Sequence, residues 1–138
     1  MKQQTYWHIQ LHPPFSNIGE KEILQQTNLI GLGEGEENKR QIKQFSDEMK
    51  IGDIVLIKRG KLSIALVEVV GELEYNSTPN PALDWFECRR KIKILEILDE
   101  ARHDFPQPSG TLSKAKNIST KTYQYINDWY NKIVQNTS

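Results

Sequence analysis

The stretch Met49-Lys-Ile-Gly-Asp-Ile-Val-Leu-Ile-Lys-Arg-Gly-Lys-Leu-Ser-Ile-Ala-Leu-Val-Glu-Val-Val-Gly-Glu-Leu-Glu-Tyr75 decides the fold. It predicts two β-strands, 53–58 and 62–75, joined by a tight turn at Arg59-Gly60-Lys61. Gly60 supplies the positive φ that a short hairpin needs, and β-branched residues fill both arms. Gly71 interrupts the second arm and predicts a bulge or bend there. We expect this hairpin to be the centre of a small β-barrel.

The residues on either side of the hairpin predict a mixed chain. Residues 6–12 alternate as a strand, with Trp7 and Ile9 on one face and Tyr6 and His8 on a face that we expect to be solvated. The other predicted elements are helices at 20–27, 36–49 and from Ser119 or Thr120 to about 134, and a strand at 85–98. The prediction is an α+β fold: a small, curved, mostly antiparallel β-barrel flanked by helices.

Composition sets the class of protein. The 138 residues suit a single domain, 1–138, and 18 basic residues balance 18 acidic ones. The single cysteine, Cys88, excludes an internal disulfide and favours a reducing compartment. No apolar run approaches the roughly 18–20 residues of a membrane span, and the first residues lack the apolar region of a signal peptide. We therefore expect a cytoplasmic protein without a membrane partner.

The search for catalytic chemistry is negative. The glycine-rich segment 31–35 lacks the Lys-Ser/Thr of a phosphate loop, and its acidic neighbours would repel phosphate. On a strand, His8 and His12 would lie about 13 Å apart, too far to share a metal ion. Cys88 shares the alternation of Phe86 and Ile92, as a small buried residue does. The sequence predicts no catalytic residue, no metal site and no cofactor.

Aromatic and basic residues remain. Tyr75 and Trp85 flank the polar segment 76–84, where their rings could stack on a flat ligand or simply pack under the loop. The basic side chains of the hairpin and of the strand 85–98 could contact phosphates or only be solvated. These side chains are Lys58, Arg59 and Lys61, with Arg89, Arg90, Lys91 and Lys93.

Several of these motifs together resemble the PUA-like superfamily, which includes EVE, YTH and ASCH domains. The resemblance runs from Tyr6 to about Leu98. It depends on Tyr6-Trp7-His8-Ile9, on Ile30-Gly31-Leu32-Gly33 before Asn38, on Met49-Lys-x-Gly-Asp-x-Val55, and on Val67-Glu68-Val69. The continuation Gly71-Glu-Leu-Glu-Tyr75, then Arg89, Arg90 and Ile92-Lys-Ile-Leu95, is most similar to the EVE/YTH-like N-terminal domains of McrB-like and Mrr-like modification-dependent restriction proteins.

The resemblance implies a pocket for an extruded modified base. Its lining would be Trp7, His8, Ile30, Gly31, Leu32, Gly33, Asn38, Tyr75 and Trp85, with Lys58 beside it. Phosphates would be contacted by Lys58, Arg59, Lys61, Arg89 and Arg90. Many relatives carry a tryptophan where this chain has Ile30-Gly31-Leu32, so an aliphatic wall would replace one ring.

The expected function is a non-catalytic nucleic-acid recognition module that binds a flipped, methylated base in DNA. It would be the specificity domain of a modification-dependent restriction system. Its nuclease or NTPase partner would be a domain of the same, longer protein or a separate subunit. Two alternatives stay open: a reader of methylated adenine in single-stranded RNA, and a peptide-binding interaction domain. An ASCH-type hydrolase is disfavoured because the chain lacks a Gly-x-Lys-x-x-Glu pattern.

Overall fold

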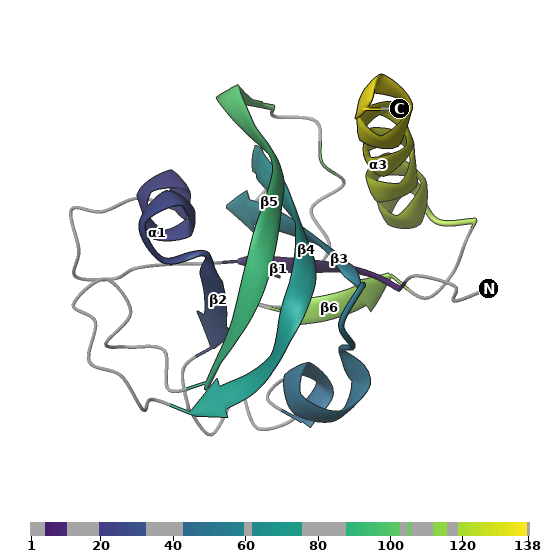
Figure 1. Ribbon diagram of the computed structural model, residues 1–138. Helices are drawn as coiled ribbons and strands as arrows, with labels where there is room; N and C mark the ends of the chain where they lie inside the picture. The colour runs from purple at the N-terminus through teal and green to yellow at the C-terminus, as the bar shows by residue number, and fades with distance from the viewer. Residues whose placement is uncertain are drawn as a thin grey trace.

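The computed structural model describes residues 5–10, 20–32, 43–59, 62–75, 88–102, 105, 112–115 and 119–137. These residues form a curved sheet with helical segments on both of its faces (Figure 1). In chain order the elements are β1 Tyr6–Gln10, α1 Glu20–Thr27, β2 Leu29–Leu32, the π-helical turn η2 Gln44–Glu48, β3 Ile54–Arg59, β4 Leu62–Tyr75, β5 Cys88–Arg102, β6 Leu112–Ala115 and α3 Lys121–Thr137.

The sheet has six strands in the order β2-β5-β4-β3-β1-β6. Its ladders are antiparallel except for β1 and β3, which run parallel with Trp7 opposite Val55. This confirms the predicted α+β class with a curved, mostly antiparallel sheet. Within the described ranges no ladder joins the edge strands β2 and β6, so the barrel is open rather than closed.

The predicted hairpin is the centre of this sheet. β3 and β4 pair antiparallel, with Arg59 opposite Leu62, while Gly60 and Lys61 lie outside the described residues. The bulge predicted at Gly71 is confirmed, because the β4–β5 register shifts between Val69 and Leu73. A Cβ atom on Gly71 would lie 2.9 Å from the Cβ of Lys91, so the close approach of the two strands requires glycine here.

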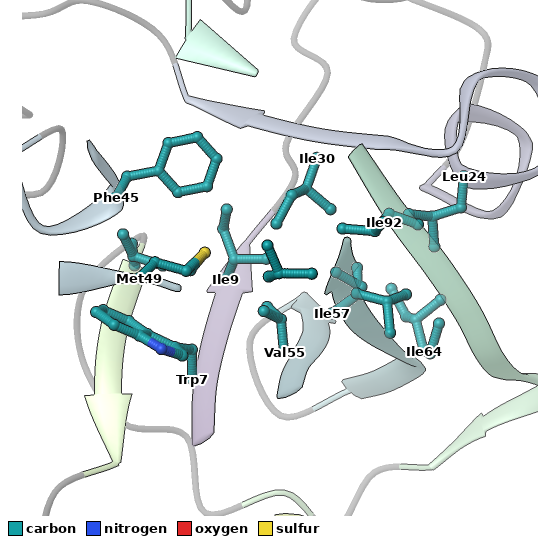
Figure 2. Packing of buried hydrophobic residues seen from close by; sticks show 14 residues of the cluster. Trp7, Ile9, Leu24, Ile30, Phe45, Met49, Val55, Ile57, Ile64 and Ile92 are labelled. Carbon is teal, nitrogen blue, oxygen red and sulfur yellow. The ribbon is translucent and has the colours of Figure 1, made fainter. Parts of the chain in front are cut away.

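The inner face of the sheet, which we define as the face covered by α1 and η2, holds the larger part of the core. Trp7 and Ile9 of β1 pack there against Phe45 and Met49 from the η2 region, as Figure 2 shows. Leu24 of α1 closes the opposite side of the cluster. The remaining buried members come from β2 to β6: Ile30, Val55, Ile57, Ile64, Ala65, Val67, Val69, Ile92 and Leu112.

The outer face is covered by α3. Ile126 and Trp129 of this helix pack on a second cluster that includes Tyr6, Ile54 and Leu56. Thr120 caps the helix, since its Oγ1 accepts a hydrogen bond from the Tyr123 backbone N at 3.2 Å. The predicted final helix and its cap are thus confirmed.

The expectation that one face of β1 is solvated was wrong. Tyr6 is 6% exposed and His8 is 1% exposed, because α3 and Phe105 cover that face. The Tyr6 hydroxyl donates to Asn127 Oδ1 at 2.8 Å, and its ring lies 5.0 Å from that of Tyr123. Burial first, and then Tyr123 and Tyr130, raise the pKa of Tyr6 to about 12. The alternating pattern identified the two faces of β1 correctly. It carries no information about α3, which lies more than 100 residues further along the chain and covers one of these faces.

Other elements differ in extent. Residues 29–32, expected as a glycine-punctuated segment, form strand β2, and strand β6 was not predicted. The helix predicted over 36–49 is described only from Lys43, and its 44–48 portion is a π-helical turn. The strand predicted at 85–98 begins at Cys88 in the described part and continues to Arg102. No helix among the described residues is both long and apolar enough to span a membrane.

Candidate functional site

Trp7 and Ile30, two residues of the expected base pocket, lie together in the core of the inner face. Both are 0% exposed. The Trp7 indole Nε1 donates to Asp53 Oδ2 at 3.0 Å, which satisfies the polar edge of the ring inside the protein. Trp7 therefore offers no surface to a ligand in this conformation. Its role here is to support the sheet beneath any pocket.

Asp53 is the polar centre of this region. Besides the Trp7 indole, its carboxylate accepts the backbone N of Lys50 at 3.0 Å and the backbone N of Thr5 at 3.3 Å. The side chain is 5% exposed, so it holds three donors with little help from water. Gly52, with φ 100°, makes the turn that aims Asp53 inward. From the sequence, Gly52-Asp53 indicated only the start of a strand. It did not indicate that the Asp53 carboxylate accepts these hydrogen bonds.

Arg90, expected to contact phosphate, lies buried in this structure and hydrogen-bonds to backbone carbonyl groups. Its Nη1 donates to the carbonyl oxygens of Phe45 and Met49, each at 2.8 Å, and its Nε donates to the carbonyl of Gly71 at 3.1 Å. The residue is 2% exposed, and burial lowers its pKa, although Glu72 and Asp53 oppose that effect. The alternation of Arg90 with Ile92 and Ile94 already placed it on the buried face.

Among the described residues, those expected to contact phosphate do not form one surface. The hairpin end that carries Lys58 and Arg59 lies beside Arg102 of β5, because Ser63 pairs with Arg102. Arg89 pairs with Glu74 at the other end of β5, thirteen positions away, which is about 40 Å of strand. Arg59 is exposed, whereas Arg89 is 4% exposed and Lys58 is 3% exposed.

His8 also lies away from the expected pocket, because it points to the outer face. Its ring stacks edge-on against Phe105 at 5.7 Å, and its Nδ1 has no hydrogen-bond partner. Burial, and secondarily the charge of Lys58, lowers the pKa of His8 to about 3. Burial likewise lowers the pKa of Lys58. The two groups form a desolvated polar pair under α3, with the Ser63 and Tyr125 hydroxyls 2.8 Å apart on the same face.

Two of the predicted pocket segments do meet, at a corner of the sheet. Cys88, the first residue of β5, pairs with Leu32 on one side and with Tyr75 on the other. The end of β2, the start of β5 and the end of β4 therefore lie side by side, at the lower left of Figure 1. We call Leu32, Cys88 and Tyr75 the β2–β5–β4 corner. Gly31, the residue before Leu32 in β2, pairs with Arg89 and is buried.

The rest of the predicted set cannot be placed. Gly33, Asn38, Lys61 and Trp85 lie outside the described residues. In the part of the chain that the structure describes, no three His, Cys, Asp or Glu side chains gather as metal ligands would.

The fold resembles that of solved YTH domains. It matches the Mmi1 YTH domain at a TM-score of 0.57 and 11% identity, covering 94% of this chain and 79% of that one. A second Mmi1 YTH structure gives 0.56 and 10%, covering 94% and 99%. The YTH domain of Zygosaccharomyces rouxii MRB1 protein, in complex with N6-methyladenosine RNA, gives 0.56 and 8%, covering 94% and 86%. The chain spans 62% and 57% of two other Mmi1 structures.

These likenesses define the class: the chain has the YTH-like, PUA-like fold that its sequence motifs predicted. Residues 13–127 match the family described as "Domain of unknown function (DUF8426)", and the chain belongs to that family. A search of curated proteins gave no match.

Proposed function

We propose that the protein is a non-catalytic reader of a modified base in single-stranded RNA, and that the base is bound at the β2–β5–β4 corner. The observation that carries the proposal is the corner itself. Two predicted pocket segments, far apart in sequence, flank Cys88 on adjacent strands. In sequence, Gly33 directly follows Leu32, and Trp85 precedes Cys88 by three residues, so the proposal assigns both to the same pocket.

The corner suits a base for physical reasons. A base reader needs a flat apolar slot, close approach of backbone, and a few polar groups for the base edge. Gly33, next to Leu32 in sequence, carries no side chain that would keep a base away from the backbone. In this proposal Tyr75 and Trp85 are the candidate rings for stacking, and Asn38 is the candidate amide for the base edge. Trp7, His8 and Arg90, expected earlier to touch the ligand, are not part of this proposed pocket.

The preference for RNA over DNA follows from the fold neighbours. One of them is a YTH domain in complex with N6-methyladenosine RNA, so methylated adenine is the first base to test. The McrB-like and Mrr-like reading, with a modified DNA duplex and a nuclease or NTPase partner, has no comparable support. It becomes the better reading only if duplex DNA outcompetes RNA.

The test compares binding to one short single-stranded RNA with either adenine or N6-methyladenine at a single position. We expect the methylated strand to bind about tenfold or more tightly, the usual scale for one added methyl group in an apolar slot. Tyr75→Ala and Trp85→Ala should bring this ratio close to one, because stacking is lost. The control Tyr130→Ala, on α3 across the sheet, should keep the ratio.

Three outcomes would contradict the proposal. Equal binding of plain and methylated RNA across a panel of modified bases would reject base reading. Retained discrimination in both Tyr75→Ala and Trp85→Ala would reject the corner as the pocket. A stronger preference for a modified DNA duplex in competition would replace RNA by DNA.

A further inference from the structure

An open groove runs along β5, between the α1–β2 junction and β4. Its volume is about 590 Å³. Residues 91–94 of β5 form its length, Val70 of β4 forms one wall, and Thr27 and Asn28 at the α1–β2 junction form the other. We call it the β5 groove. It is separate from the Asp53 and His8 clusters described above.

The backbone shapes this groove. The Ile92 backbone N donates to the Asn28 carbonyl at 2.8 Å, which anchors the α1–β2 junction beside β5. Asn28 has φ 53°, a left-handed conformation that few residues other than glycine adopt readily. On the other wall, Val70 faces outward next to the buried Val69, just before the register shift around Gly71, and is 44% exposed. An outward-facing valine beside a bulge is a built feature of this surface.

The chemistry of the lining is cationic and apolar. Lys91 and Lys93 are exposed, whereas the alternating Ile92 and Ile94 side chains pack toward the core, and no carboxylate lines the groove. The carboxylate nearest in register is Glu68, the cross-strand neighbour of Lys93. Two ammonium groups, the exposed Val70 side chain and one amide match a nucleotide, which carries a phosphate, an apolar base face and a hydrogen-bonding edge.

We propose that the β5 groove binds a nucleotide flanking the modified base, with Lys91 and Lys93 on its phosphates and Val70 against its base or sugar. The proposal rests on the proposed function in taking the two nucleotides to belong to one strand. Position supports it: Lys91 is three residues along β5 from Cys88, about 10 Å by strand rise. A strand held at the corner therefore passes close to the groove.

The test is a salt titration. The double variants Lys91→Glu/Lys93→Glu and Lys91→Gln/Lys93→Gln are compared with Lys121→Gln/Lys132→Gln, two exposed lysines of α3. The probes are a methylated and a plain single-stranded RNA of equal length. The Glu pair should weaken both RNAs about tenfold at low salt. The Gln pair should reduce the slope of log affinity against log salt by about 1.4, or about 0.7 per lost phosphate contact. The α3 pair should change neither.

The ratio of methylated to plain affinity separates the two proposals. Phosphate contacts carry no base information, so we expect the groove variants to keep the wild-type ratio. The wild-type protein could show no preference for methylated RNA while the groove variants still bind RNA more weakly than it does. That result would support the groove proposal and reject the base-pocket proposal.

The reverse outcome is equally clear. A normal methyl preference with affinity and salt slope unchanged in both groove variants would overturn the groove while leaving the pocket intact. Absence of any RNA binding by the wild-type protein would overturn both. The Gln pair guards against misfolding, because it places no new negative charge beside Glu68; its thermal midpoint should match the wild type.

Discussion

Asp53 shows how one residue of the decisive hairpin connects distant parts of the chain. Its carboxylate ties the indole of Trp7 in β1 to the backbone of Lys50 before β3, and it also reaches Thr5. Buried donors that lose their acceptor keep the cost of their desolvation. The residue therefore holds the first strand at its place beside β3.

We predict that Asp53→Ala lowers the free energy of unfolding by about 2–4 kcal/mol, because a buried indole N–H and two backbone N–H groups lose a charged acceptor. Urea unfolding of both proteins measures the difference. Asp128→Ala, at an exposed position of α3, is the matched control and should change stability by less than about 0.5 kcal/mol. Equal stability of Asp53→Ala and wild type would show that water replaces these contacts.

His8 gives a prediction about pH. Its pKa is lowered to about 3 in the folded protein, against 6.5 ordinarily, so the unfolded chain takes up the proton first as pH falls. Stability should therefore begin to decline near pH 6.5, with a limiting slope of about 1.4 kcal/mol per pH unit, until the folded histidine also protonates near pH 3. Well above pH 6.5 both states are unprotonated, so His8 contributes no pH dependence there.

The measurement is the thermal midpoint at several pH values between 7 and 5, where most carboxylates stay ionised. His8→Leu removes the titrating group and should flatten this part of the curve relative to wild type. Parallel curves for the two proteins would mean that His8 is protonated in the fold, or solvated enough to titrate normally.

At the scale of elements, Arg90 fastens η2 to the sheet. One guanidinium binds carbonyl groups at both ends of that turn and a third carbonyl in the β4 bulge. The unusual π-helical turn thus has a partner for its outer carbonyls, as irregular backbone requires when buried. η2 in turn presents Phe45 and Met49 to the core, so the clamp and the core support each other.

We predict that Arg90→Met lowers the free energy of unfolding by about 2–4 kcal/mol through three unpaired carbonyl groups. Because Arg90 has almost no exposed surface, the salt dependence of RNA binding should not change. Lys93→Met should show the opposite pattern: nearly normal stability and a smaller salt slope. A reduced salt slope in Arg90→Met, measured below its unfolding transition, would return Arg90 to the phosphate-binding set.

At the scale of the whole molecule, sequence patterns predicted what is local. The β3–β4 hairpin, α1, the Gly71 bulge and the Thr120 cap follow from neighbouring residues, and the structure confirms them. What the patterns could not predict depends on distant partners. Trp7 and Arg90 were assigned to the ligand because aromatic and basic residues are typical of nucleic-acid sites. Strand alternation agrees with their burial, but their hydrogen bonds to Asp53, Phe45 and Met49 join segments whose proximity no local pattern encodes.

The candidate site shows the same division between what the sequence predicts and what the assembled sheet decides. The motif resemblance placed residues 30–32 and Tyr75 in one pocket, and the strand pairing does bring both segments to Cys88. Residue type alone grouped the hairpin cations with Arg89, which the register puts at the opposite end of β5. Residue type is visible in sequence, whereas register is a property of the assembled sheet.

The place of β1 has a consequence for the time course of folding. β1 lies between β3, which follows it by about fifty residues, and β6, which follows it by more than a hundred. On the ribosome, the first strand to emerge cannot acquire both neighbours until nearly all of the described chain has been made. Such high contact order is typical of slow folders. Until β6 arrives, one edge of β1 stays open to association with other nascent chains.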